Sequence, residues 1–110
     1  LQIRPKILES AIRNLLDNAL RFSGEDTDVV VHVGEASPKW LRVTVTDRGE
    51  GISEANQARV WERFFTTARE RGGTGLGLAI VRSAVDAHGG HVGLWSAVGH
   101  GTKVWFELPL

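Results

Sequence analysis

The chain of 110 residues contains no cysteine and no methionine. Without cysteine it can have no disulfide framework, no thiolate zinc site and no cysteine nucleophile. Charge of one sign is also lacking, because 13 lysine and arginine residues balance 13 aspartate and glutamate residues. A neutral chain has no broad positive field, so we expect it to bind neither nucleic acid nor an anionic membrane surface.

Long apolar runs are absent as well. No stretch approaches the roughly 20 residues that a membrane-spanning helix needs, and no charged and then apolar leader opens the chain. The length and the hydrophobic content of 42% suit one domain over residues 1–110. Because the chain starts at Leu1 and has no methionine, we expect it to be a segment of a longer protein.

The most informative segment is a glycine-rich loop that turns directly into an apolar helix, RGGTGLGLAIV over residues 71–81. Glycine permits positive φ angles and lets a phosphate approach backbone N–H groups closely. The start of the following helix offers unpaired N–H donors and the positive end of its dipole. The segment therefore predicts a binding site for a phosphorylated ligand, with a structural turn as the alternative.

Three common glycine-loop sites do not fit this segment. A P-loop requires lysine after its last glycine, whereas Gly77 is followed by Leu78. The dinucleotide pattern G-x-G-x-x-G fails because Ile80 occupies the third glycine position counted from Gly75. A eukaryotic-type protein kinase would also need its strand lysine and its catalytic Asp and Asn, and no such arrangement is present.

Apolar periodicity predicts an α+β fold in which helices cover one face of a sheet. We expect helices over residues 5–22, 53–61 and 76–88 and strands over residues 29–33, 41–46, 91–96 and 103–108. Pro5 suits a first helical turn, and Ser53 suits the cap of the second helix. Gly89 and Gly90 predict a left-handed end to the third helix.

The first helix carries a polar stripe opposite its apolar face, formed by Asn14, Asp17, Asn18 and Arg21. Asparagine is a mediocre helix former, so two of them suggest carboxamide oxygens that are needed at fixed points. Neutral oxygen ligands beside an arginine suit a Mg²⁺ ion that completes its octahedron with phosphate oxygens and water. The alternative is a solvated helix face.

A second polar motif, DRGEGI over residues 47–52, follows the second expected strand. The Asp47 carboxylate can only accept hydrogen bonds, so it suits the exocyclic amine of adenine, which guanine lacks at that position. Gly51 would let a ring approach the backbone, and Ile52 would pack on it. The alternative is a turn closed by an Asx hydrogen bond.

Four motifs in a fixed order resemble one family: NLLDNA at 14–19, DRGEGI at 47–52, GTGLGL at 73–78 and GHGT at 99–102. Together they are similar to the catalytic and ATP-binding domain of bacterial sensor histidine kinases, in the GHKL superfamily. Residues 61–65, WERFF, resemble its aromatic box. The resemblance implies the Bergerat fold, a two-layer α/β sandwich with an ATP lid, in which three helices cover one face of a mixed, mostly antiparallel sheet.

The resemblance implies ATP and Mg²⁺ as ligands and assigns them residues. Asn14 would hold the metal, Asn18 and Arg21 would lie on the phosphate side, and Phe22 would form a wall of the base pocket. Asp47 would bind the adenine amine, joined by Thr102 through water or hydroxyl contacts. The remaining nucleotide-binding residues would be Gly49, Gly51, Ile52, Gly73, Thr74, Gly75, Leu76, Gly77 and Leu78.

The implied lid departs from the family pattern. Thr66 stands where many members have an arginine that touches the γ-phosphate, and Ala68 stands where lids of this type usually have lysine. Arg69 or Arg71 is the candidate phosphate clamp, and we assign Arg69 to the catalytic set with Asn14 and Arg21.

One further feature favours a kinase over an ATPase, and another concerns the residue that accepts the phosphoryl group. Related ATPases carry a water-activating Glu one turn before the metal-binding Asn, and here that residue is Ser10. Glu9 lies about 100° away around the helix, so we expect poor hydrolysis. None of the histidines is followed by an acidic residue, as the family's phosphoacceptor normally is; they are His32, His88, His91 and His100.

We therefore expect the acceptor histidine on a separate dimerisation segment of the parent protein, with a response regulator as the next partner. The domain alone would be a monomer and would face the cytoplasm, and the parent would be an inner-membrane sensor. Two alternatives stay open. One is an anti-sigma-type serine kinase, and the other is a partner-docking regulatory module with little kinase activity.

Overall fold

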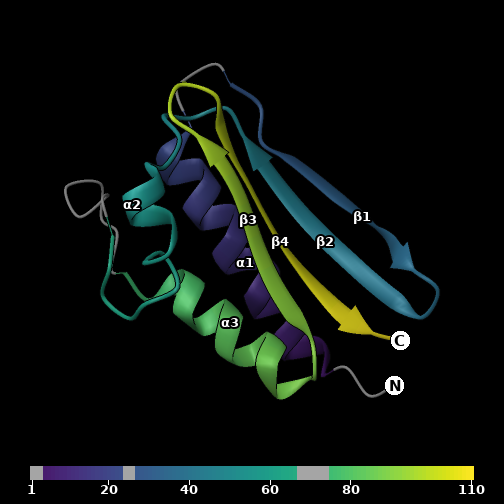
Figure 1. The fold of residues 1–110 in the computed structure, drawn as a ribbon. Helices are drawn as coiled ribbons and strands as arrows, with labels where there is room; N and C mark the ends of the chain where they lie inside the picture. The colour runs from purple at the N-terminus through teal and green to yellow at the C-terminus, as the bar shows by residue number, and fades with distance from the viewer. Residues whose placement is uncertain (1–3, 24–26, 67–74) are drawn as a thin grey trace.

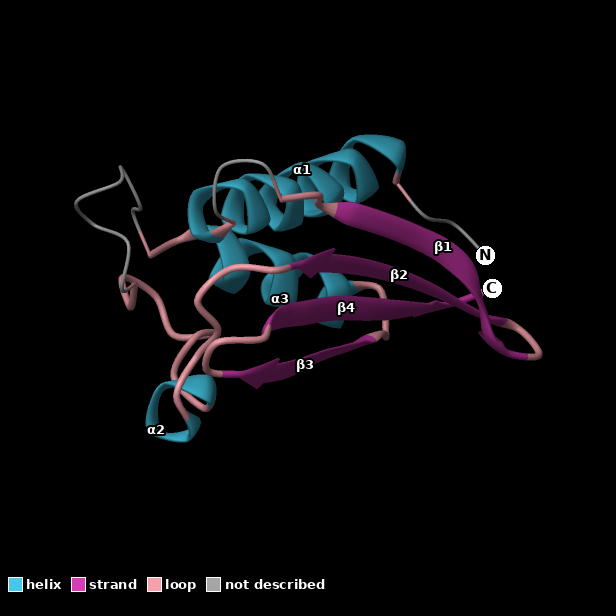
Figure 2. Ribbon diagram, turned by 90° about the horizontal axis from the view of Figure 1, so that it is seen from above, coloured by secondary structure: helices cyan, strands magenta, loops and turns pink. Residues whose placement is uncertain are grey.

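The computed structural model describes residues 4–23, 27–66 and 75–110. Along the chain the elements are α1 (Pro5–Phe22), β1 (Val30–Ser37), β2 (Trp40–Asp47), α2 (Glu54–Gln57), α3 (Gly77–Ala87), β3 (His91–Ala97) and β4 (Gly101–Pro109). The long helices α1 and α3 pack against each other and lie on one side of the sheet (Figures 1 and 2). This two-layer α+β arrangement confirms the expected fold class.

The sheet has four strands in the order β1-β2-β4-β3, and each neighbouring pair is antiparallel. The sequence analysis expected a mixed, mostly antiparallel sheet, and within the described residues no parallel pair occurs. Strand β1 extends further than expected, to Ser37, before the turn that leads to Trp40. It forms an edge of the sheet, and most of its side chains are exposed.

Helix α1 spans the predicted residues, begins with proline in its first turn, and buries Ala11, Leu15 and Ala19. Helix α3 begins one residue later than expected, at Gly77, and ends one residue earlier, at Ala87. The predicted left-handed conformation follows at Gly89, which has φ 74°. Within the described residues no helix combines the length and the apolar character that a membrane span requires.

The second helix is shorter than predicted. It ends at Gln57 instead of Trp61, and the Ser53 side chain makes no capping hydrogen bond. None of the residues of α2 is buried, so no apolar face holds it against the sheet. Since short helices owe most of their stability to such packing, the chain turns away after one turn of helix.

The core lies between the helix layer and the inner face of the sheet. Its largest fully buried side chains are Phe106, Leu15, Val43, Val45, Val81 and Val85. Across β2, β4 and β3 the inward residues form rows, and one apolar row consists of Val45, Val104 and Leu94. The next row, at the end of the strands, is polar and consists of Asp47, Thr102 and Ser96. This polar row marks the end of the sheet that faces the loops.

Candidate functional site

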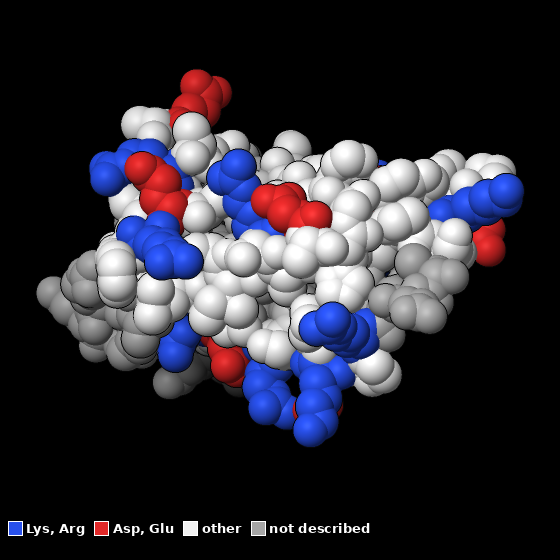
Figure 3. Space-filling view, turned by 90° about the horizontal axis from the view of Figure 1, so that it is seen from below, with Lys and Arg blue, Asp and Glu red and all other residues white. Residues whose placement is uncertain are grey.

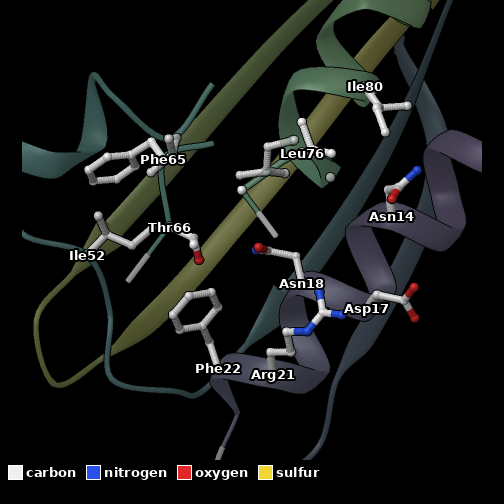
Figure 4. Close-up of a pocket in the computed structure, with 14 residues that line it drawn as sticks. Asn14, Asp17, Asn18, Arg21, Phe22, Ile52, Phe65, Thr66, Leu76 and Ile80 are labelled. Atoms are coloured by element: carbon white, nitrogen blue, oxygen red, sulfur yellow. The ribbon is translucent and has the colours of Figure 1, made fainter. Parts of the chain in front are cut away.

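A cavity of about 230 Å³ lies between α1, the start of α3 and the loops at the polar end of the sheet (Figure 4). It is lined by Asn14, Asp17, Asn18, Arg21, Phe22, Ile52, Val60, Phe65, Thr66, Gly75, Leu76, Gly77, Leu78 and Ile80. The polar stripe of α1 thus faces the glycine segment, about 60 residues further along the chain. Segments that the sequence analysis singled out separately share one site.

Asn14 is held in a defined orientation at this cavity. Its Nδ2 donates a hydrogen bond of 2.9 Å to the Ser10 carbonyl oxygen. Its other polar atom, Oδ1, lies on the side of Gly77, 3.5 Å from where a Cβ on that glycine would be. The amide therefore presents an acceptor oxygen beside the start of α3, which is the donor type that suits Mg²⁺.

Asn18, Arg21 and Phe22 follow Asn14 along the same side of α1 and point toward the cavity (Figure 4). Their spacing of three to four residues explains this placement, because such residues are neighbours on a helix surface. Asn18 supplies a further amide and Arg21 a guanidinium, while Phe22 supplies an aromatic wall. One end of the cavity can thus meet anionic oxygens and another can meet an apolar ring.

The start of α3 closes the opposite side. Gly75 has φ 76°, and a Cβ there would lie 2.3 Å from the backbone carbon of Phe64. The Phe64 N–H donates to the Gly75 carbonyl oxygen at 2.7 Å. The chain can return this closely to residue 64 only because position 75 is glycine. Arg69, Arg71, Gly73 and Thr74, which the sequence analysis placed in the lid, lie outside the described residues.

Asp47 is buried at the end of β2, with 3% of its surface exposed. Burial raises the pKa of Asp47 above its ordinary value, although hydrogen bonds from the backbone of Gly49 and Thr102 act in the opposite direction. The Gly49 N–H lies 2.8 Å from Asp47 Oδ1. This is the Asx turn that the sequence analysis kept as an alternative, and it coexists with a carboxylate placed near the cavity.

Asp47, Gly49, Gly51 and Thr102 are not among the described residues that line the cavity. Gly49 packs directly on a residue of the cavity wall, because a Cβ on it would come within 1.9 Å of the Phe22 carbonyl oxygen. Gly51 has φ 78° and packs on the backbone of Ala97 in the same way. Within this loop only Ile52 reaches the lining.

Sequence reasoning missed two polar residues that hold this loop, Ser96 and Gln57. The Ile52 N–H donates to Ser96 Oγ at 2.7 Å. Gln57 Nε2 donates to the Ile52 carbonyl oxygen at 2.8 Å and to the Ser96 carbonyl oxygen at 3.1 Å. The signal for Ser96 was available, because a polar residue follows Val92 and Leu94 in the inward register of its strand.

Glu9 points away from the cavity. It forms an ion pair of 2.7 Å with Arg13, and it lines a separate groove on the outer side of α1. This agrees with its expected position on another side of the helix. Among the residues that the structure describes, no three acidic or histidine side chains gather into a metal site, so a divalent cation here would depend on Asn14 and on the oxygens of its ligand.

A family model described as histidine kinase-, DNA gyrase B-, and HSP90-like ATPase matches residues 3–110. The chain belongs to this family. Within this ATPase family it is similar to sensor histidine kinases, and the predicted resemblance is thereby confirmed. The sensor-like histidine kinase SenX3 of Mycolicibacterium smegmatis is 41% identical in an alignment 107 residues long, which covers 94% of this chain and 28% of SenX3.

The sensor histidine kinase AruS of Pseudomonas aeruginosa is 42% identical over 113 residues, covering 96% of this chain and 11% of AruS. The chain therefore spans less than a third of the length of each of these two relatives. Among solved structures, the mycobacterial sensor histidine kinase MprB matches with a TM-score of 0.87 at 34% identity, over 97% of this chain and 72% of that one. Full-length ShkA in complex with AMPPNP matches with a TM-score of 0.83 at 35% identity, over 94% of this chain and 21% of ShkA.

Proposed function

We propose that residues 1–110 form the catalytic domain of a sensor histidine kinase, which binds Mg-ATP and donates the γ-phosphoryl group to a histidine on a separate dimerisation helix. The observation that carries this proposal is the single cavity in which the Asn14 stripe of α1 faces the start of α3. A ligand there would meet amide oxygens, a guanidinium and helix N-terminal N–H groups on one side. It would meet apolar side chains on the other, as a nucleotide requires.

The base would lie toward Phe22 and Ile52, with its amine directed to Asp47 and Thr102. The triphosphate would extend toward Asn18, Arg21 and the start of α3. Bound Mg²⁺ would neutralise charge on the phosphate oxygens and align the γ-phosphoryl group for in-line transfer. Asn14 fits this ion because its Nδ2 is engaged by Ser10 and its Oδ1 stays available. Arg69 stays a prediction for the phosphate clamp.

The residues around the cavity favour transfer over hydrolysis. Ser10, one turn before Asn14, has a hydroxyl that is no base for water near neutral pH, and Glu9 is paired with Arg13 outside the cavity. A water molecule would therefore find no general base in the Glu position that related ATPases use. An external nucleophile that brings its own activating group would react in its place.

The nucleophile is external on this proposal, because none of the four histidines lines the cavity. His88 Nδ1 lies 2.8 Å from the Ala84 carbonyl oxygen, behind α3, and His91 stacks on Trp40 with ring centroids 5.2 Å apart. We infer that the acceptor histidine belongs to another segment of the parent protein. A response regulator would then take the phosphoryl group in the cytoplasm.

Charge on the surface gives no support for a nucleic-acid ligand. On the face that Figure 3 shows, basic and acidic side chains are interspersed over a largely uncharged surface. The formal net charge of zero agrees with this distribution. These charges favour a small phosphorylated ligand over nucleic acid.

Calorimetry with a non-hydrolysable ATP analogue tests the binding step. We expect adenine-selective binding that weakens when Mg²⁺ is chelated, and GTP serves as the base control. Asn14→Ala should weaken binding at least about tenfold with Mg²⁺ present and much less without it. Asn56→Ala, a half-buried asparagine that does not line the cavity, is the matched control. Absence of binding at millimolar nucleotide would favour the partner-docking alternative.

Phosphotransfer needs its own experiment. The domain is incubated with labelled ATP and either a histidine-bearing dimerisation domain or a serine-bearing protein acceptor. Label that is stable in alkali and lost in acid, on the histidine-bearing acceptor alone, supports the proposal. Label on the serine-bearing acceptor would favour the serine kinase alternative.

A further inference from the structure

Three polar side chains lie side by side across three strands at the loop end of the inner sheet face. Asp47 on β2 pairs with Thr102 on β4, and Thr102 pairs with Ser96 on β3. Residues directly opposite in an antiparallel pair share one face of the sheet. Within this row Thr102 lies between Ser96 and Asp47, so it connects the two side chains.

The hydrogen-bond partners of Ser96 fix where its single proton goes. Ser96 Oγ lies 2.9 Å from the Gly101 carbonyl oxygen, which can only accept. It lies 2.7 Å from the Ile52 nitrogen, which can only donate. Its third partner is Thr102 Oγ1 at 2.8 Å. A hydroxyl has one proton and two lone pairs, so the Gly101 carbonyl takes the proton and one lone pair accepts from Ile52.

All three contacts of Ser96 are hydrogen bonds at the same time in only one arrangement of protons. In that arrangement Thr102 donates its proton to the remaining lone pair of Ser96, because Ser96 has no second proton to give. Thr102 Oγ1 keeps its own lone pairs, so it is an acceptor toward any other group. The Asp47 carboxylate beside it is an acceptor as well. Two acceptors next to each other suit an amine, which has two protons, and repel a carbonyl oxygen.

We propose that Ser96 is a specificity-determining residue, which acts through Thr102 to keep an acceptor pair facing the exocyclic amine of adenine and to exclude the carbonyl oxygen of guanine. This inference rests on the proposed function, since it concerns the base of the bound nucleotide. Ser96 is a positioning residue, because it touches Thr102 and Ile52 rather than the ligand. If Ser96 did not offer its lone pair, the Thr102 hydroxyl could rotate and donate to the carbonyl oxygen of guanine.

Ser96 also holds the Ile52 backbone, so its removal could loosen the cavity wall in general. Such a structural effect would weaken the binding of ATP and of GTP by similar factors. The ratio of the dissociation constants for GTP and ATP therefore distinguishes the support of Ile52 from the orientation of the Thr102 hydroxyl, whereas the absolute affinity does not. Threonine at this position would keep the hydroxyl and suits a strand, so Ser96→Thr should keep the ratio near the wild-type value.

The test measures both dissociation constants for the wild-type domain and for the Ser96→Ala, Ser96→Thr and Thr102→Val variants, with Mg²⁺ present. We expect Ser96→Ala to lower the ratio of the GTP dissociation constant to the ATP dissociation constant about tenfold, which is the effect of one mismatched buried hydrogen bond. Ser96→Thr should stay within about twofold of the wild type, as should the control Ser83→Ala, which alters an exposed serine on α3. Thr102→Val removes the hydroxyl itself and should lower the ratio as well.

A double variant completes the design. If Ser96 acts through the Thr102 hydroxyl, then Ser96→Ala should leave the ratio unchanged in the Thr102→Val background. An equal ratio in wild type and Ser96→Ala would overturn the proposal, and so would a further loss of selectivity in the double variant. A wild-type domain that binds neither nucleotide, or binds both equally, would instead contradict the proposed function, and it would do so before any variant is compared.

Discussion

Asn14 Oδ1 lies 3.5 Å from the place where a Cβ on residue 77 would be, and residue 77 is glycine. This contact joins the amide stripe of α1 to the first residue of α3, at the cavity. The distance is an ordinary van der Waals contact, and Gly77 has no positive φ. The fold would therefore accept the methyl group of an alanine at position 77, but that methyl group would occupy space beside Asn14 that a bound ligand needs.

Gly77→Ala should separate stability from ligand binding. Alanine lowers the entropy of the unfolded chain and suits a helix, so urea unfolding should show a stabilisation of about 0.5–1 kcal/mol. The added methyl group beside Asn14 should weaken binding of the Mg²⁺–ATP complex about tenfold or more in calorimetry. A variant that is more stable and binds equally well would contradict the assignment of this contact to the ligand site.

The raised pKa of Asp47 predicts a pH-dependent stability. Because burial raises the folded-state pKa, the folded chain holds this proton more tightly than the unfolded chain does. The stabilisation is full below the unfolded-state pKa and is lost as pH rises through the folded-state pKa. Asp47→Asn removes this titration. The free energy of unfolding of the variant minus that of the wild type should therefore increase as pH rises from the unfolded-state pKa to the folded-state pKa, by about 1.4 kcal/mol for each unit of pKa shift.

The measurement is urea unfolding of both proteins at a series of pH values from acid to neutral. Above the folded-state pKa the difference should reach a plateau. The same substitution should weaken ATP binding, since the amide replaces one acceptor oxygen by a donor. Stability and function would thus change in opposite directions at one residue, which is common at binding sites. A constant difference at all pH values would show that Asp47 titrates normally.

Much of this arrangement was predictable from sequence because it depends on local periodicity. The spacing of Asn14 and Asn18 placed them on one side of α1, and the alternation of apolar and polar residues over 41–46 indicated a strand with one buried face. Periodicity could not give the length of α2, which was expected to reach Trp61 but ends at Gln57 and has no buried residue. The hydrogen bond from the Ile52 N–H to Ser96 joins residues that are 44 positions apart in sequence, so no local pattern reveals it.

The position of Asp47 shows the same limit at the site itself. Its motif indicated a polar turn at the end of a strand, and the structure has that turn. The motif does not tell how deeply the carboxylate lies, since its burial to 3% exposure depends on tertiary packing such as that of Gly49 against the Phe22 backbone of α1. Local sequence therefore predicted the residue and its chemistry, whereas tertiary packing set its depth.

The pairing of Glu9 with Arg13 leads to a prediction about hydrolysis. Glu9 forms its ion pair outside the cavity, so Glu9→Gln should leave ATP affinity and the slow basal hydrolysis within about twofold of the wild type. The surface ion pair itself contributes only about 0.3–0.5 kcal/mol to stability. A steady-state phosphate-release assay checks this prediction. A tenfold fall in hydrolysis would identify Glu9 as the general base after all.

Two glycines in the turn between β3 and β4 allow a matched comparison of backbone strain and steric clash. Gly99 and Gly101 have φ angles of 83° and 93°, so alanine is strained at both. A Cβ at position 99 would meet no atom within 4 Å, whereas a Cβ at position 101 would lie 2.2 Å from the Asp47 carbonyl oxygen. That oxygen belongs to the backbone of β2 and cannot move without disturbing the polar row of the sheet.

Gly99→Ala should therefore cost about 1–2 kcal/mol, the cost of a left-handed conformation. Gly101→Ala should cost at least about 2 kcal/mol more, because the clash adds to the same strain. Urea unfolding of both variants measures the difference, and nucleotide binding should fall only for Gly101→Ala, since that substitution displaces Asp47. Equal costs for the two variants would mean that the β2 backbone yields easily, and a rigid position for the Asp47 carboxylate would then be wrong.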